Sequence, residues 1–168
     1  MNIYYRKGTK TDLPDLKKLA VKSWQQFQKD LTTENWKNLS NTLIDNNTYT
    51  ELLDTSYCIV STTDQNEIVG MAFLVPKGNP TAIYDKEWCY IRFVTVDPDF
   101  EGHGIGKKLT ALCIEIAQEN NEKVIALHTS EIMDKARRIY ESLGFKILKE
   151  IDQRLGKKYW LYTLDLIK

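Results

Sequence analysis

The fold of this chain is decided by the stretch IRFVTVDPDFEGHGIGKKLTALCIEIA, which covers residues 91–117. The residues before the aspartate and proline are mostly β-branched or aromatic and predict a strand. In the last part, Leu109, Cys113 and Ile116 recur at helical spacing and predict an apolar helix face. A glycine-rich turn joins the two, so the stretch predicts a strand that leads directly into a helix packed on the same sheet.

The turn carries glycines at positions 102, 104 and 106. Glycine permits positive φ and lets a ligand approach bare backbone, while the start of a helix presents unpaired N–H groups and the positive end of its dipole. Lys107 and Lys108 add positive charge beside this point. The turn therefore predicts a site for phosphate oxygens. The alternative is a tight connection that uses glycine only for its geometry.

Two common phosphate-binding loops do not match this turn. A P-loop needs glycine, four further residues and then Gly-Lys-Ser/Thr. Here Glu101 occupies the first glycine position and Lys108 the hydroxyl position. The dinucleotide fingerprint fails because the glycines are spaced evenly by two, and because the strand lies in the middle of the chain. A nucleotide-binding domain of another kind stays as an alternative, which protection against heat by ATP or NAD would reveal.

The rest of the chain divides into further strands and helices. Periodicity and turn residues predict strands at 3–6, 57–61, 68–75, 88–96, 124–128, 145–151 and 159–166, and helices that start at Thr11 or Asp12, at Thr33, after the glycine turn and near Ile132. The strand 88–96 is apolar on nearly every residue, so we expect it to be central and covered on both faces. This order predicts an α+β fold in a single domain, residues 1–168. Its mixed, twisted sheet would have about six or seven strands, flanked by about four helices.

Composition excludes several classes of function. Among the 168 residues, 23 basic and 23 acidic side chains balance, so the charge predicts neither nucleic acid nor an anionic membrane as a partner. Cys58, Cys89 and Cys113 are far apart and only two histidines are present, so we expect no disulfide framework and no metal. No apolar run approaches the ~18 residues needed to span a bilayer, and we expect a cytoplasmic protein.

Two separated motifs resemble the GNAT superfamily of N-acetyltransferases. The first is Val96-Asp97-Pro98 followed by Gly104 and Gly106, which is similar to the acetyl-CoA motif of the family. The second is the segment from Ala136 through Tyr140 to Gly144-Phe145, in the order that the family uses. Glu101 and Met133 depart from the family pattern, which usually has Arg or Gln and Asn at these positions. Both departures bear on cofactor affinity.

The resemblance implies where acetyl-CoA binds. In the family, the cosubstrate lies in a splay between two strands, here those that end at Val96 and near Thr129. The implied cofactor-binding residues are Val94, Val96, Gly102, His103, Gly104, Ile105, Gly106 and Lys107. Tyr140 matches the position that protonates the departing coenzyme A sulfur, and it is the implied catalytic residue. A core tyrosine on an apolar helix face is the alternative for Tyr140.

The general base that deprotonates the amine is not at the position where the family usually has it. Many members carry a glutamate on the central strand, six residues before the first motif, but this chain has Tyr90 there. Asp85, Glu87, His128 or water could remove the proton instead. The alternative for Asp85 and Glu87 is that they are solvated loop charges. The alternative for His128 is that it is a half-buried strand residue. Likewise, Trp24, Phe27 and Trp36 could wall an acceptor pocket or simply belong to the core.

Taken with the resemblance, these residues predict an enzyme, an acetyl-CoA-dependent N-acetyltransferase. It would move the acetyl group to a primary amine of an unidentified small molecule or peptide, by direct transfer in a ternary complex. No covalent nucleophile is needed for this chemistry. The alternative function is a non-catalytic sensor or regulatory module that binds coenzyme A. Either a monomer or a homodimer is compatible with the sequence.

Overall fold

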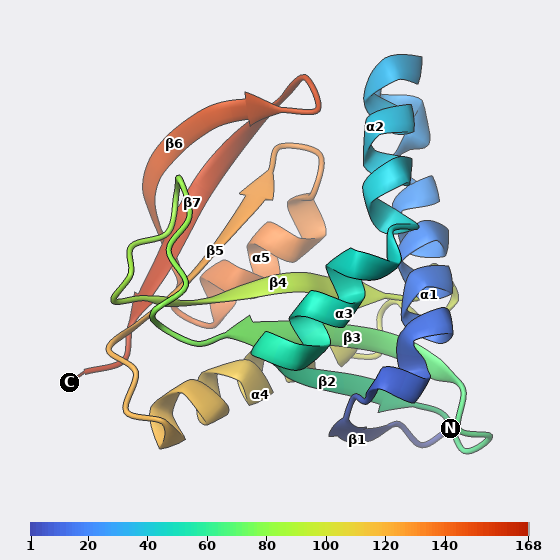
Figure 1. Cartoon of the computed structure of the whole chain (residues 1–168), viewed down its shortest axis with the longest axis horizontal. Coiled ribbons are helices and arrows are strands. Elements are labelled where there is room, and N and C mark those ends of the chain that lie inside the picture. The colour runs from blue at the N-terminus through green and yellow to red at the C-terminus, as the bar shows by residue number, and fades with distance from the viewer. Residues whose placement is uncertain (168) are drawn as a thin grey trace.

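The computed structural model describes residues 1–167 and contains one open sheet in the order β1-β2-β3-β4-β5-β7-β6 (Figure 1). The strands are β1 (Tyr4–Lys7), β2 (Tyr57–Thr62), β3 (Ile68–Val75), β4 (Cys89–Val96), β5 (Val124–Ser130), β6 (Lys146–Arg154) and β7 (Lys157–Asp165). The helices are α1 (Leu13–Gln25), α2 (Thr33–Leu43), α3 (Asn46–Thr55), α4 (Ile105–Glu119) and α5 (Asp134–Ser142), with short 3-10 turns η1 (Lys10–Asp12), η2 (Gln28–Asp30) and η3 (Pro98–Phe100). Only β4 and β5 pair in parallel, which confirms the predicted mixed sheet and α+β class.

Helices cover both faces of the sheet, with α1, α2 and α3 on one face and α4 and α5 on the other (Figure 1). Each face has its own apolar core because side chains alternate between the two faces of a strand. On β4, Tyr90 joins the core beneath α1 and α3, whereas Ile91 joins the core beneath α4. This confirms that the apolar strand is central and covered on both faces.

The centre of β4 contains a β-bulge. Met71 of β3 pairs with Thr95, but Phe73 pairs with Arg92, so β4 has one more residue than β3 between these two pairs. Phe93 lies at the bulge with a φ of 55°, a conformation that is uncommon for a bulky side chain. The bulge changes the direction of β4 just before its carboxyl end.

Next to the bulge, β4 separates from β5. The two strands pair only at Cys89 with Ile125 and at Tyr90 with Ala126. Beyond these pairs β5 continues alongside β7, to which it is bonded along its whole length. The carboxyl ends of β4 and β5 therefore diverge, as the resemblance implied, and the site described below occupies this divergence.

One helix was not predicted. This helix is α3, which begins after Asp45. The Asp45 carboxylate accepts a hydrogen bond of 3.1 Å from the amide of Asn47. Tyr49 and Leu52 are its buried residues, and the Tyr49 hydroxyl donates to the carbonyl oxygen of Leu43 at 2.6 Å. The prediction missed this helix because most of its residues are polar and its apolar face is short. Packing against α1 stabilises the helix where its intrinsic helix propensity would not.

Residues with positive φ form two of the turns that shape the site. Gly144, at a φ of 99°, follows the end of α5 in the left-handed conformation that often ends a helix. The β6–β7 hairpin turns through Leu155 and Gly156, at φ values of 55° and 70°. Two successive residues at positive φ keep this turn tight, and its tip lies near α2.

Candidate functional site

A groove of about 1020 Å³ opens where β4 and β5 diverge. At one end it is lined by the turn between β4 and α4 together with the start of α5, and we name this the cofactor end. At the other end it is lined by α1, α2 and the tip of the β6–β7 hairpin, and we name this the acceptor end. The predicted residues Val94, Val96, Gly102, Gly104, Ile105, Gly106, Lys107, Tyr140 and His128 all line this groove.

The turn at the cofactor end is held in place by a network of charges. The carboxylate of Asp97 accepts a hydrogen bond of 2.9 Å from the amide of Asp99. From α1, the ammonium group of Lys22 lies 2.8 Å from a carboxylate oxygen of each aspartate. The hydrogen bond with Asp97 is the largest of the causes that raise the pKa of Lys22 above its ordinary value. These contacts fix η3, and with it the direction in which the glycine turn approaches the groove.

Two of the three glycines leave room for a ligand. Gly102 and Gly104 have φ values of 81° and 74°, and a Cβ atom at either position would meet nothing within 4 Å. Gly104 is the N-cap of α4, so the unpaired amides of the first turn face the same space. A diphosphate fits this backbone, with Lys107 beside it. Coenzyme A is therefore compatible with the residues present.

Gly106 does not have positive φ. It belongs to α4 and is not among the glycines with positive φ. A Cβ atom there would lie 3.5 Å from Ile139 and 3.6 Å from Val96. These are ordinary van der Waals distances, so neither the backbone nor the packing at this position requires glycine.

His103 is the predicted cofactor residue that does not line the groove. Its side chain is exposed, and Nδ1 lies 3.0 Å from the carbonyl oxygen of Phe100. This contact ties the imidazole to its own turn, so the turn contributes its backbone and not the imidazole.

Glu101, which departs from the family pattern, is paired across the cofactor end. Its carboxylate lies 2.7 Å from the ammonium group of Lys135 on α5. Lys135 thereby offsets the negative charge that would repel phosphate oxygens. Met133, the second departure, precedes α5 and lines the groove, where its sulfur accepts a hydrogen bond of 3.4 Å from the Thr129 hydroxyl.

Tyr140 of α5 is among the residues that line the groove. It is 7% exposed and packs edge-on against Phe145, with ring centroids 6.1 Å apart. Burial raises the pKa of Tyr140 above its ordinary value of 10.0. The phenol therefore keeps its proton at neutral pH and can donate it inside the groove.

His128 lies at the acceptor end, among groups from three other segments. Its Nδ1 is 2.5 Å from the Tyr84 hydroxyl, and its Nε2 is 3.4 Å from a guanidinium nitrogen of Arg154. Since a guanidinium can only donate, Nε2 is the acceptor and the proton sits on Nδ1, which donates to Tyr84. Tyr159 lies on a further side, with ring centroids 5.9 Å apart.

The charge state of His128 follows from this environment. Burial, and then the charges of Arg154 and Arg92, lower its pKa from 6.5 to about 4. The imidazole is therefore neutral near pH 7, and its Nε2 lone pair accepts from Arg154 at the wall of the groove.

The other candidates for the base have structural roles. The hydroxyl of Tyr90 donates to the carbonyl oxygen of Asn79 at 3.0 Å, and its ring stacks on that of Tyr84 at 4.0 Å. This fastens the loop that precedes β4. Asp85 accepts a hydrogen bond of 2.8 Å from the amide of Glu87, and neither acid is among the groove-lining residues of the described chain. Of the side chains proposed as a base, only His128 reaches the groove.

The prediction missed four groove residues that carry charge, Arg92, Asp134, Lys135 and Arg154. Arg92 could have been noticed, because it is the one charged residue in the apolar strand CYIRFVTV. Arg154 has no such signal, since β6 is polar along most of its length. Among the aromatic candidates, Trp24 and Phe27 line the groove, while Trp36 is not a lining residue within the described chain.

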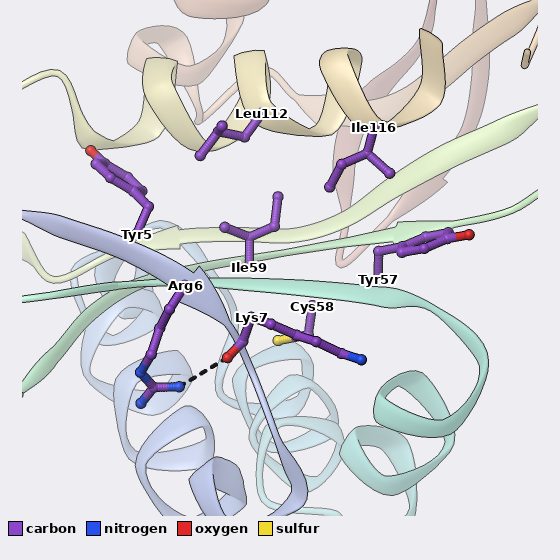
Figure 2. Close-up of a pocket in the computed structure, with 8 residues that line it drawn as sticks. All are labelled: Tyr5, Arg6, Lys7, Tyr57, Cys58, Ile59, Leu112 and Ile116. Carbon is purple, nitrogen blue, oxygen red and sulfur yellow. Dashed lines mark hydrogen bonds between the residues drawn. The ribbon is translucent and has the colours of Figure 1, made fainter. Parts of the chain in front are cut away.

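A second, smaller hollow of about 270 Å³ lies between β1, β2 and α4. Figure 2 shows Tyr5, Ile59, Leu112 and Ile116 extending into it, while Arg6 points away. Its walls are mainly apolar, and it contains none of the predicted site residues. In residues 1–167 no cluster of three or more His, Cys, Asp or Glu side chains could hold a metal ion. No helix in that range is long and apolar enough to cross a membrane.

Comparison with known families agrees with this geometry. Residues 15–145 match the model described as the acetyltransferase (GNAT) family. The chain therefore belongs to the GNAT acetyltransferase family, whose members use acetyl-CoA as the acetyl donor. This confirms the resemblance carried by the two motifs.

The curated relatives are longer than this chain. N-acetylaspartate synthetase of Danio rerio is 37% identical over 68 residues, which are 40% of this chain and 24% of the relative. N-acetyltransferase 8B of Homo sapiens is 28% identical over 134 residues, which are 80% of this chain and 55% of the relative. The matched regions thus span between 24% and 55% of these two relatives.

Solved structures share the fold over almost the whole chain. PaiA N-acetyltransferase from Thermoplasma acidophilum, in complex with coenzyme A, has a TM-score of 0.80 at 16% identity and covers 98% of this chain and 99% of its own. The ribosomal-protein-S18-alanine N-acetyltransferase of Escherichia coli has a TM-score of 0.72 at 15% identity, covering 98% of this chain and 94% of its own. These likenesses confirm the predicted GNAT-like fold.

Proposed function

We propose that this chain transfers the acetyl group of acetyl-CoA directly to a primary amine of a small molecule or peptide, within a ternary complex. One observation carries the proposal. A single groove is lined by a glycine turn at a helix N-terminus, a buried protonated tyrosine and a neutral histidine. All of these groups belong to one chain, so a monomer or a homodimer could carry out the reaction.

At the cofactor end, the backbone of the turn binds phosphate. The proposed contacts are the amides at the start of α4 together with Gly102, Gly104 and Lys107, while Val94 and Val96 line the path of the pantetheine arm. Lys135 takes up the charge of Glu101, so the carboxylate does not oppose this binding.

The chemistry needs an acid and a base at opposite sides of the reacting carbon. Acetyl-CoA, when bound, supplies the acetyl carbon to which the amine nitrogen bonds and the sulfur that leaves as a thiolate. Tyr140 donates its proton to that sulfur, and His128 takes the proton that the nitrogen loses, directly or through water. A weak base is sufficient for this step, because the nitrogen becomes more acidic as it forms its new bond.

The identity of the amine is suggested only in outline by the relatives. Two of them are named N-acetylaspartate synthetase, after a product whose acceptor amine belongs to an amino acid. For this chain the acceptor class in the proposal is a primary amine.

The proposal is tested by thiol release from acetyl-CoA in the presence of amines, using polyamines, amino acids, aminoglycosides and peptides with free N-termini. Release that depends on an amine and saturates with it supports the transferase. Saturable binding of coenzyme A without release for every amine would instead establish the sensor.

Tyr140→Phe tests the acid within the same assay. We expect kcat to fall about 100-fold or more, which is the usual contribution of a positioned acid, while coenzyme A affinity changes little. Tyr5→Phe is the matched control, since Tyr5 lies at the second hollow. Unchanged turnover in Tyr140→Phe would remove this residue from the mechanism.

A further inference from the structure

The acceptor end of the groove carries two positive charges. Arg92 extends from the bulged part of β4, and Arg154 from the last residue of β6. Both line the groove. The acidic lining residues, Glu101 and Asp134, lie at the cofactor end, where they pair with Lys135 and Arg137. In the part of the chain that the structure describes, the charged side chains that line the acceptor end are therefore Arg92 and Arg154.

Neither guanidinium is paired with a carboxylate of residues 1–167. The cations of the ion pairs in that range are Arg6, Lys10, Lys22, Lys135, Arg137 and Lys158. Arg92 instead lies over the ring of Phe93, 5.3 Å from its centroid, and Arg154 donates weakly to His128. Arg92 is half-buried, and a partly buried guanidinium normally has an anionic partner. Arg154 is exposed. These two present their donors to the groove.

Both arginines surround the group proposed as the base. Their charges contribute to the lowered pKa of His128, and they also act on the Tyr84 phenol beside it. An anion bound between them would therefore lie next to the imidazole. It would also accept the hydrogen bonds that Arg154 directs at Nε2, which frees that nitrogen to receive a proton.

The tip of the β6–β7 hairpin and α2 both line the acceptor end. Leu155 at the hairpin tip lines the groove together with Asn38 and Leu39 of α2. The tip and α2 meet, since a Cβ atom on Gly156 would lie 3.0 Å from Nδ2 of Asn35. Figure 1 shows the hairpin reaching toward α2 over the end of the sheet.

We propose that the acceptor is a small amino acid whose carboxylate is bound by Arg92 and Arg154, so that its amine is presented to His128. Planar guanidinium groups match the geometry of a carboxylate, and two of them hold it in one orientation. The inference rests on the proposed function, because it names the acceptor of the same reaction. It assigns Arg92 and Arg154 as specificity-determining residues.

The experiment compares acceptors that differ only in this charge. Thiol release from acetyl-CoA is measured with the L-amino acids, with their α-carboxamides and with the corresponding decarboxylated amines. We expect the best amino acid to exceed its uncharged counterparts by about 10-fold or more in kcat/KM, since charge-assisted hydrogen bonds are lost in the counterparts.

Arg92→Gln and Arg154→Gln test the two residues. Each is expected to raise KM for the amino acid about 10- to 100-fold and to remove the preference over its carboxamide, with a smaller effect on kcat. Lys158→Gln is the matched control, because Lys158 follows the same hairpin but is not a lining residue of the groove. A preference that survives in both arginine variants would overturn the proposal.

A binding measurement separates this inference from the proposed function. Calorimetry follows binding of the same amino acid to protein saturated with coenzyme A, in each variant, with the melting temperature as a check on folding. Amines used equally well with and without a carboxylate would overturn the inference and leave acetyl transfer intact. Binding that requires both arginines, with no thiol release from any amine, would support the arginine site and refute the transferase.

Discussion

The two ends of the groove are built in different ways. The cofactor end comes largely from one continuous stretch, in which β4, the glycine turn and the start of α4 present backbone amides to the ligand. The acceptor end comes from side chains on α1, α2, β4, β5 and the β6–β7 hairpin. A site built from backbone amides tolerates substitution of most neighbouring side chains. In a site built from side chains, each substitution changes which ligand binds. One groove can thus keep its acetyl donor and vary its acceptor.

The ends also differ in how their charges are balanced. At the cofactor end Glu101 is paired with Lys135, and Asp97 and Asp99 are paired with Lys22. At the acceptor end Arg92 and Arg154 lie near a half-buried histidine without a carboxylate partner from residues 1–167. Substitutions at the two ends should therefore have separable effects, on coenzyme A affinity in one case and on the acceptor or on pH dependence in the other.

The largest effect is expected from Gly104→Val at the cofactor end. A β-branched residue is strained at a φ of 74°, and its side chain would occupy the open space in front of the α4 amides. We expect coenzyme A affinity to fall by at least about 100-fold, measured by calorimetry, because several backbone hydrogen bonds would be lost together.

Gly78→Val is the matched control for this change. Gly78 has a φ of 92° and open space around it, but it is not a lining residue of the groove. It should lose stability through the same backbone strain while binding coenzyme A normally. Retained affinity in Gly104→Val would refute the pyrophosphate assignment.

A smaller effect, on stability, is expected from His128 at the acceptor end. Its folded-state pKa of about 4 lies below the ordinary 6.5, so between these pH values the unfolded chain binds a proton that the folded chain does not. Stability should therefore fall as the pH drops through this window, by up to about 3 kcal/mol from this group. His128→Gln should flatten this part of the pH dependence.

The measurement is urea unfolding at several pH values between 7.5 and 4. His103→Gln serves as the control, since that imidazole is exposed. Equal slopes in the wild type and in His128→Gln would show that the folded environment does not hold His128 neutral.

The smallest effect is expected from Glu101→Gln. The pair with Lys135 is exposed on the lysine side, so its loss should change the free energy of unfolding by less than about 1 kcal/mol. Removing the carboxylate leaves Lys135 free to face the phosphates, and coenzyme A affinity should rise by about 2- to 5-fold at low salt. In Glu150→Gln, which breaks a surface pair with Lys158, affinity should not change. Weaker binding in Glu101→Gln would assign the carboxylate a direct role in holding the cofactor.

Prediction from sequence succeeded where a signal was contiguous. The apolar strand from Cys89 to Val96, the turn after it and the segment that leads to Gly144 each contain their own evidence, since periodicity and glycine conformation depend on neighbours in the chain. The prediction missed α3, because this helix depends on what packs against it.

For this chain, the order of residues was sufficient to define the family, the phosphate-binding turn and Tyr140 as the candidate acid. The acceptor end needed the folded molecule, because Arg92, His128 and Arg154 are separated in sequence and meet only where β4 diverges from β5 and the hairpin closes over the opening. The lowered pKa of His128 arises from burial and from the nearby charges of Arg154 and Arg92. This environment is created by packing and not by any residue alone, so only the folded structure could indicate a carboxylate as the partner of the acceptor end.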